Sequence, residues 1–258
     1  MSGHDPYAPV RAAVNLQTWR HLTFLHWAYD VETVQALVPP PLRVQTWEGQ
    51  TWVGVIPFQM ADVRLPPSLP SPPGWDTFAE LNVRCYVRAP DGRDGIWFLG
   101  MVVPRASFAL SLRSIGLPYE VADGVVTHRN DDSGRDEIGD EDARWDYRFG
   151  PPRGVLGLRT PQDTPWFTAS VQTGAPLTAQ ERTPLVESLA GRWTAYHRRA
   201  RVLWRTPVEH EPWPLRHGTV TGELTAPLRW VGLPAPAGDP IVQTSAVVHA
   251  RLGTFRPA

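Results

Sequence analysis

The sequence predicts an α+β fold that is mainly antiparallel β, barrel-like, and contains a few short helices. Three observations support this. Short apolar runs separated by turns occur along the whole chain, and the 258 residues include 28 Pro, which favour turns over long helices. One stretch, residues 78–88, alternates strictly between two faces. No internal repeat or linker divides the chain, so we expect a single domain over residues 1–258, with residues 1–15 as a loose arm.

The stretch from Phe78 to Arg88 organises the prediction. Its odd-numbered residues from Ala79 to Val87 are all apolar, as expected for a strand packed on a core. Its other face carries Glu80, Asn82 and Arg84 in a row, about 6–7 Å apart along the strand. Two interpretations remain open: the row is a solvated outer face, or it lines a pocket inside a barrel or between sheets.

The other predicted strands follow from β-rich or alternating runs bounded by turn residues. Glu48-Gly49 marks a hairpin, Asp91-Gly92 marks the next turn, and the charged run 129–144 is expected to be an exposed hairpin connection. These strands cover residues 16–27, 42–47, 51–59, 96–103, 120–128, 144–149, 201–205, 218–224 and 241–252.

Short helices are predicted where capping residues precede apolar spacing of three or four. Asp30 is expected to cap a helix over 31–38, which the prolines at 39–41 end. A second helix covers 106–114, with Gly116 as its stop. Thr183-Pro184 starts a third, with one apolar stripe formed by Leu185, Leu189 and Trp193. Residues 228–231 are expected to form a helical turn.

Composition excludes several classes of function. The formal net charge of −1 gives no reason to expect nucleic acid or a membrane surface as partner. No apolar run reaches the roughly 18 residues of a membrane span, and the N-terminus lacks a signal-peptide pattern. The single cysteine, Cys85, rules out an internal disulfide and favours a cytoplasmic location. The chain contains no lysine, so no side chain can form a Schiff base.

The common chemical motifs are missing, including phosphate loops, dinucleotide fingerprints, nucleophile elbows and paired metal ligands. We therefore expect no cofactor and no metal. His210 stands between Glu209 and Glu211, but strand alternation would place the three on different faces. Most tryptophans are expected in the core, although three could wall an apolar pocket: Trp27, Trp52 and Trp97.

Several spaced motifs resemble one known family. In order along the chain they are Leu22-Thr-Phe-Leu-His-Trp27, Leu37-Val-Pro39, Trp52-Val-Gly-Val-x-Pro-Phe58, Glu80-x-Asn-Val-Arg84 and Gly116-Leu-Pro-Tyr119. Together they resemble the YqjF-like proteins, a family with a domain of unknown function that is grouped with the acetoacetate decarboxylase-like superfamily. The resemblance implies a curved antiparallel sheet closed like a cone around an interior pocket. It is also the sole basis for expecting a homo-oligomer.

The resemblance can be carried over residue by residue. The strand glutamate of the decarboxylases is similar to Glu80, and Arg113 is retained from a neighbouring segment. The Schiff-base lysine falls on Tyr119, the lysine beside it on Glu120, and the substrate-facing arginine on Ala28. Losing the nucleophilic amine removes imine formation, which argues against acetoacetate decarboxylase activity.

We therefore predict a protein that binds a small oxo or hydroxy acid, or a planar apolar ligand, in a pocket. It would act as a lyase or isomerase, with Glu80 and Tyr119 as catalytic residues. The expected substrate-binding residues are Asn82, Arg84, Arg113, Glu120, Trp27 and Trp97. Two alternatives stay open: a non-catalytic module that binds or senses a ligand, and a buried polar network with no function beyond satisfying itself.

Overall fold

The structure is a computed structural model that describes residues 7–65, 69–129, 143–154 and 166–258. Seven strands form a closed ring in the order β11-β10-β5-β4-β3-β1-β13, and β13 pairs back to β11 at Val208↔Leu252. All neighbours in the ring are antiparallel except β5 and β10. The ring strands are β1 (Ala13–Asp30), β3 (Gln50–Arg64), β4 (Thr77–Arg88), β5 (Asp94–Val103), β10 (Thr194–Arg199), β11 (Val202–Glu209) and β13 (Ile241–Gly253). The predicted fold class is confirmed.

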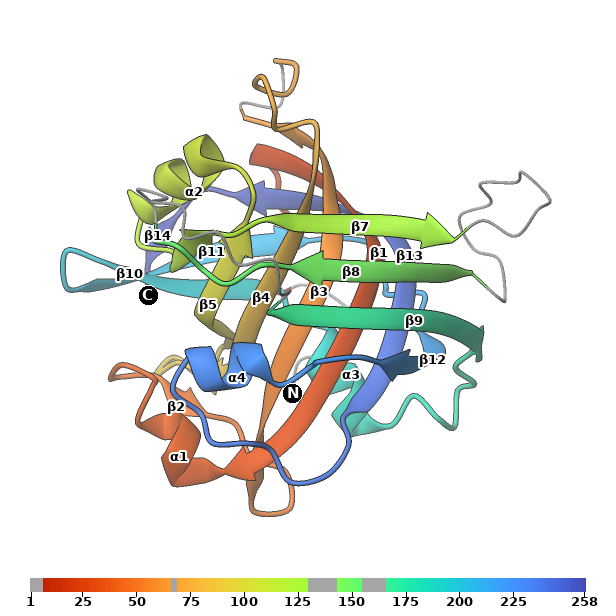
Figure 1. The fold of residues 1–258 in the computed structure, drawn as a ribbon. Helices are drawn as coiled ribbons and strands as arrows, with labels where there is room; N and C mark the ends of the chain where they lie inside the picture. The colour runs from red at the N-terminus through yellow and green to blue at the C-terminus, as the bar shows by residue number, and fades with distance from the viewer. Residues whose placement is uncertain (1–6, 66–68, 130–142, 155–165) are drawn as a thin grey trace.

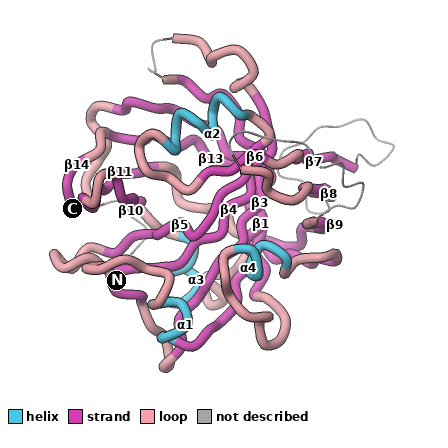
Figure 2. The backbone as a smooth tube through the Cα atoms, turned by 60° about the vertical axis from the view of Figure 1, so that its left-hand side comes forward, coloured by secondary structure: helices cyan, strands magenta, loops and turns pink. Residues whose placement is uncertain are grey.

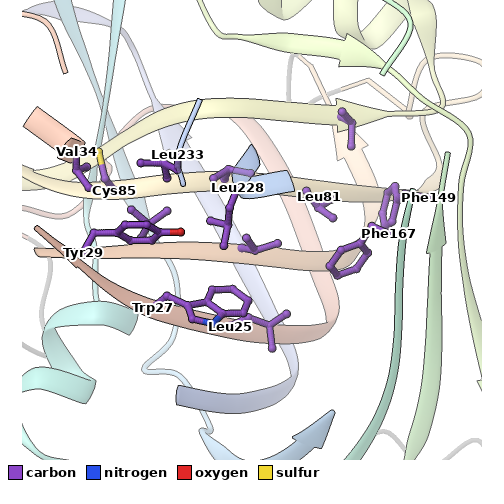
Figure 3. Close-up of a cluster of buried hydrophobic side chains, with 14 of the residues drawn as sticks. Leu25, Trp27, Tyr29, Val34, Leu81, Cys85, Phe149, Phe167, Leu228 and Leu233 are labelled. Atoms are coloured by element: carbon purple, nitrogen blue, oxygen red, sulfur yellow. The ribbon is translucent and has the colours of Figure 1, made fainter. Parts of the chain in front are cut away.

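A second layer of strands covers one side of the ring. From β13 the sheet continues through β12, β9, β8 and β7, and these strands cross over the long strands β1, β3 and β4 (Figure 1). Their bounds are β7 (Gly124–Arg129), β8 (Arg144–Phe149), β9 (Phe167–Pro176) and β12 (Arg216–Thr221). The space between the layers is filled by a hydrophobic cluster that includes Leu81, Cys85, Phe149 and Phe167 (Figure 3). We call this cluster the outer core.

The remaining elements are short and lie around the ring (Figure 2). In α3, the Thr183 hydroxyl accepts a hydrogen bond from the Val186 amide at 3.3 Å, and Pro184 occupies the first turn, as the sequence predicts. These elements are α1 (Val31–Gln35), β2 (Arg43–Val44), α2 (Ala106–Arg113), β6 (Tyr119–Val121), α3 (Pro184–Ala190), α4 (Ala226–Trp230) and β14 (Arg256–Pro257). None of the helices in the described ranges has both the length and the apolar character needed to cross a membrane.

Several local predictions differ from the structure. The predicted strand 42–47 reduces to β2, which pairs with β4, whereas the predicted turn at Glu48-Gly49 is present and is closed by a Trp47↔Gln50 bridge at the start of β3. The predicted strand 120–128 divides into β6 and β7, and strands β9 and β10 were not predicted. The third helix ends at Ala190, before Trp193. The predicted hairpin connection over 129–144 lies largely outside the described residues.

The N-terminal segment also differs from the predicted loose arm over residues 1–15. Strand β1 begins at Ala13, and Val10 is buried. The Val10 amide donates to the Glu209 carboxylate at 2.7 Å, and the Tyr7 hydroxyl accepts from the Asp94 amide at 2.8 Å. The described part of this arm, from Tyr7 onward, is therefore held against the ring.

A tight turn after α2 brings β6 to the ring. Gly116 has φ +97°, and a Cβ added there would lie 2.2 Å from the Arg198 carbonyl oxygen. We expect Gly116→Ala to lower the free energy of unfolding by about 2–4 kcal/mol, because backbone strain adds to a backbone collision. Gly74 is a matched control, since its φ is +78° but no atom lies within 4 Å of an added Cβ. Gly74→Ala should cost about 1 kcal/mol. If urea unfolding shows the same loss of unfolding free energy for both variants, the close approach of the backbone at Gly116 is contradicted.

Candidate functional site

A cavity of about 590 Å³ lies inside the ring of strands. Its wall is largely apolar, with Leu22 from β1, Phe58 from β3 and Met101 from β5 among the lining side chains. Ligand pockets of drug-sized molecules fall in this range of volume and are lined in the same way, with a few polar groups that orient the ligand. The ring therefore encloses a space large enough for a small organic molecule.

Strand β4 supplies three of the polar groups in this wall. Its alternation sends Leu81, Val83 and Cys85 to the outer core. The opposite face carries Glu80, Asn82 and Arg84, all of which line the cavity and are less than 10% exposed. The structure thus favours the pocket-wall interpretation of this row over a solvated face.

Glu80 and Tyr119 meet inside the cavity. The Tyr119 hydroxyl lies 3.1 Å and 3.2 Å from the two carboxyl oxygens of Glu80 and donates to them. Burial raises the pKa of Glu80 to about 8, and the hydrogen bond from Tyr119 opposes this only in part. Burial and the neighbouring Glu80 raise the pKa of Tyr119 well above its usual value. Glu80 is thus a buried carboxyl group that exchanges its proton near neutral pH.

Strand β6 and helix α2 hold Tyr119 in this position. Tyr119 lies opposite Met101 in the parallel pairing of β6 with β5. The Arg113 guanidinium, at the end of α2, donates to the Tyr119 carbonyl oxygen at 2.9 Å. The phenol ring also packs edge-on against Phe108, with centroids 5.4 Å apart. Arg113 therefore supports the backbone of Tyr119 and is not one of the residues that line the cavity.

Arg84 and Asn82 retain hydrogen-bonding capacity toward the cavity. Arg84 donates from Nε to the Tyr86 hydroxyl at 3.3 Å and from Nη2 to the Leu189 carbonyl oxygen at 3.2 Å. Within the described part of the chain, no carboxylate forms an ion pair with Arg84. The side-chain oxygen of Asn82 is buried and has no hydrogen-bond partner there either. Burying a charged guanidinium costs free energy, and so does burying an amide oxygen that accepts no hydrogen bond. A ligand that bonds to both groups would offset these costs.

A family model described as an uncharacterized conserved protein, DUF2071, matches residues 16–249. The chain belongs to the DUF2071 family. It is 29% identical over 227 residues to the uncharacterized protein YqjF of Bacillus subtilis (strain 168). The aligned region covers 88% of this chain and 85% of YqjF. The resemblance inferred from the spaced motifs is confirmed.

Solved structures show the same fold. An acetoacetate decarboxylase-like enzyme from Sphingomonas wittichii RW1 superposes with a TM-score of 0.62 and 12% identity, over 97% of this chain and 95% of that one. The enduracididine biosynthesis enzyme MppR, complexed with pyruvate, has a TM-score of 0.63 and 14% identity, over 97% and 93%. This DUF2071 chain therefore has the acetoacetate decarboxylase-like fold.

Three further residues predicted to bind substrate lie away from the cavity of this DUF2071 protein. Trp27 packs in the outer core beside Leu25 and Tyr29 (Figure 3). Trp97 lies opposite Cys85 in the β4–β5 ladder and therefore also faces the outer core. Glu120 alternates with Tyr119 and Val121 in β6, so its side chain points away from them. These residues, like Arg113, are not among those that line the cavity, where the sequence led us to expect them.

Bulges explain why the tryptophans could not be placed from the sequence. The β1–β3 register shifts by one residue between Arg20 and Leu25, and His21 there has φ +51°. A bulge of this kind reverses which alternate residues face inward. Trp19 therefore lines the cavity, whereas Trp27, an even number of residues later, does not.

Two cavity residues, Arg192 and His210, were not predicted. Arg192 is buried after α3, donates to the Ser188 hydroxyl at 2.7 Å, and lies 4.8 Å from the Tyr86 ring centroid. Burial lowers the pKa of Arg192 to about 10 and that of His210 to about 4. His210 packs against Trp193 and Trp213, each with ring centroids 4.5 Å away. Thr206 and Val208 also line the cavity, and His210 follows them at the same spacing of two residues. This alternation is the one feature of the sequence that indicates His210.

The histidine at 210 has a defined hydrogen bond. Its Nδ1 lies 2.5 Å from the Glu211 carbonyl oxygen, which can only accept. Because the lowered pKa keeps the ring neutral at pH 7, Nδ1 carries the proton and Nε2 is left as an acceptor. Across the described residues, no group of three or more His, Cys, Asp or Glu side chains could hold a metal.

The raised pKa of Glu80 predicts a specific dependence of stability on pH. The folded state keeps a proton that an unfolded glutamate releases, so stability falls as the pH rises toward about 8. The contribution of Glu80 to this slope should be about −1.4 kcal/mol per pH unit near pH 7 and about half of that at pH 8. The buried histidines with lowered pKa, such as His21, His26 and His210, contribute a slope of opposite sign, which fades as the pH rises above the ordinary histidine pKa of about 6.5.

Urea unfolding at several pH values checks this. Glu80→Gln should remove the negative contribution of Glu80 from the slope, because a carboxamide does not ionise but still accepts from Tyr119. Glu120→Gln is the matched control, since Glu120 lies one residue from Tyr119 but outside the cavity, and it should leave the slope unchanged. If the slope is the same in Glu80→Gln as in the unaltered protein, Glu80 does not contribute to it.

Proposed function

We propose that the cavity binds a carboxylic acid with an oxo or hydroxy group and an apolar body, and that Glu80 and Tyr119 transfer a proton on it. The observation that carries this proposal is the Glu80–Tyr119 pair. A fully buried carboxyl group whose pKa is about 8 is a suitable general acid or base near neutral pH. Such shifted groups cluster at catalytic sites.

The reaction class follows from the groups present. In its ionised form, Glu80 would take a proton from the carbon beside the oxo group, leaving an enolate. The Tyr119 hydroxyl would donate a hydrogen bond to the oxygen on which the negative charge develops. Return of the proton to a different carbon gives isomerisation, and loss of a group from the adjacent carbon gives elimination. Because the chain has no lysine, neither route passes through a side-chain imine.

The carboxylate of the ligand would be held by Arg84. A guanidinium binds a carboxylate through two parallel hydrogen bonds, and Arg84 has no carboxylate partner among the described residues. The amide oxygen of Asn82, between Glu80 and Arg84, would accept from a ligand hydroxyl. The fold neighbour MppR has been solved with pyruvate, which is itself an oxo acid. That likeness supports the ligand class and does not by itself assign the activity.

The size and character of the cavity favour an apolar body on the ligand. Its volume of 590 Å³ equals the volume that roughly twenty water molecules take up in liquid water. Apart from the polar row on β4 and its neighbours, the wall is built from side chains such as Ile56, Phe58, Phe98 and Trp19. A three-carbon acid would leave most of this surface in contact with water, whereas a longer or aromatic acid would cover it.

A chain-length series tests the proposed ligand class. Purified protein is mixed with straight-chain 2-oxo acids of increasing length and with aromatic 2-oxo acids, and its melting temperature is measured. Each buried CH₂ should strengthen binding by about 0.8 kcal/mol, and a ligand at 100 times its Kd adds about 2.7 kcal/mol of stability. When all acids are compared at the same concentration, the melting temperature should therefore rise with chain length. No shift for any acid would contradict the proposal.

The apolar wall also favours the second candidate function, a non-catalytic module that sequesters or senses such an acid. Binding alone would produce the same thermal shifts and the same dependence on chain length. Chemical change of the bound acid separates the two functions, because only the enzyme converts it.

A further inference from the structure

A second hollow, of about 470 Å³, lies on the outer side of the ring. Arg205 and Pro207 of β11 line it, and they alternate with Thr206 and Val208, which line the cavity inside. The N-terminal segment 7–12 covers this hollow and is held by Val10, whose carbonyl oxygen accepts from Arg251 at 2.9 Å. The hollow therefore lies on the other face of β11 from the proposed catalytic cavity, and Gly253 and Thr254 line both.

Positive charge is concentrated in this hollow. Four arginines line it: Arg11, Arg93, Arg205 and Arg256. One carboxylate, that of Asp91, lies 2.7 Å from Nη1 of Arg205 and 3.7 Å from Nε of Arg93. Within the described ranges, neither Arg11 nor Arg256 forms an ion pair with an acidic side chain. Four guanidinium groups sharing one carboxylate leave an excess of three positive charges.

Strand pairing adds to this imbalance. Arg256 of β14 lies directly opposite Arg205 of β11 in an antiparallel ladder. Side chains opposite each other in such a ladder are about 4.5–5.5 Å apart at Cβ, and like charges there destabilise the pair. Arg256 is itself exposed. An anion between the two guanidinium groups would turn this repulsion into attraction.

The hollow also holds two of its arginines, Arg93 and Arg205, in place. The guanidinium of Arg93 lies 4.8 Å from the centroid of the Tyr7 ring, and the Arg93 carbonyl oxygen accepts from Tyr196 at 3.2 Å. The side chains of Arg93 and Arg205 are only 34% and 25% exposed. Partly buried, pre-positioned guanidinium groups bind an anion with less loss of side-chain freedom than fully exposed ones.

We propose that this outer hollow binds a small molecule through a phosphate or diphosphate group. Several guanidinium forks around one point match the multiple oxygens and the double charge of a phosphate better than the single charge of a carboxylate. Arg205 and Arg256 would hold the phosphate from the sheet side, and Arg11 from the N-terminal segment would close over it.

Calorimetric titration of the full chain with pyrophosphate at pH 7 tests this proposal. In the control, the protein is titrated with sodium chloride at the same ionic strength. We expect saturable binding of pyrophosphate. Arg256→Gln should weaken it at least tenfold, because one of two opposed guanidinium groups is lost. Arg148→Gln is the matched control, an exposed arginine on strand β8 outside the hollow, and it should bind pyrophosphate as the unaltered protein does.

The same variants give a second readout. Without anion, Arg256→Gln should melt at the same temperature as the unaltered protein or higher, since a repulsive pair has been removed. With saturating pyrophosphate, the order should reverse. Equal affinity in Arg256→Gln and Arg148→Gln, or a response to chloride as large as that to pyrophosphate, would overturn the proposed site.

Discussion

Replacing Glu80 with glutamine should lower turnover of the acid by about 10²–10⁴-fold, the usual contribution of a positioned acid or base. The carboxamide has nearly the same shape and still accepts the hydrogen bond from Tyr119, which lies 3.1 Å away. Binding of the ligand should therefore change little, so the loss should appear in kcat and not in KM. Steady-state kinetics with the acid that gives the largest thermal shift measures both.

The control for this variant is Glu120→Gln. Glu120 follows Tyr119 directly but does not line the cavity, so its replacement should leave kcat unchanged. Turnover that survives in Glu80→Gln would remove Glu80 from the mechanism. A fall in kcat of the same size in Glu120→Gln would show that the effect comes from disturbing β6.

Replacing Arg84 with methionine should weaken binding of the acid by about 2–5 kcal/mol, which corresponds to roughly 30-fold or more in Kd. The reason is that a buried carboxylate would lose its cationic partner while still losing its water. Methionine keeps much of the length and the apolar stem of the arginine. Binding is measured by calorimetry for the unaltered protein and the variant.

A ligand control separates this effect from damage to the fold. Arg84 also donates to Leu189 and to Tyr86, so its removal can loosen the wall of the cavity. The primary amide of the same acid has no charge and should bind the unaltered protein and the variant with similar affinity. An equal loss for the acid and its amide would mean that Arg84 supports the wall and does not hold a carboxylate.

The sequence predicted most reliably what local patterns encode. The alternation from Phe78 to Arg88 placed Glu80, Asn82 and Arg84 on one face of a strand, and the structure has them on the wall of a cavity. The cap at Thr183 and the stop at Gly116 were predicted in the same way, because each depends on a few neighbouring residues. The family resemblance supplied the closure of the sheet.

What depends on distant segments could not be predicted. The shift in the β1–β3 register between Arg20 and Leu25 decides which tryptophans face inward, and no residue pattern announces it. His210 reaches the cavity at the end of β11, which pairs with β13, and Arg192 reaches it just before β10, which pairs with β5. Their sequence neighbourhoods carry no motif, so the site could not have been completed without the fold.

Hydrogen exchange at the carbon beside the oxo group tests the central claim most directly. The protein is incubated in D₂O with the 2-oxo acid that gives the largest thermal shift, and proton NMR follows the signal of that carbon. The proposed chemistry predicts loss of the signal well above the rate without protein, and a return to background with Glu80→Gln. Background exchange with an acid that demonstrably binds would contradict proton transfer and leave a ligand-binding module.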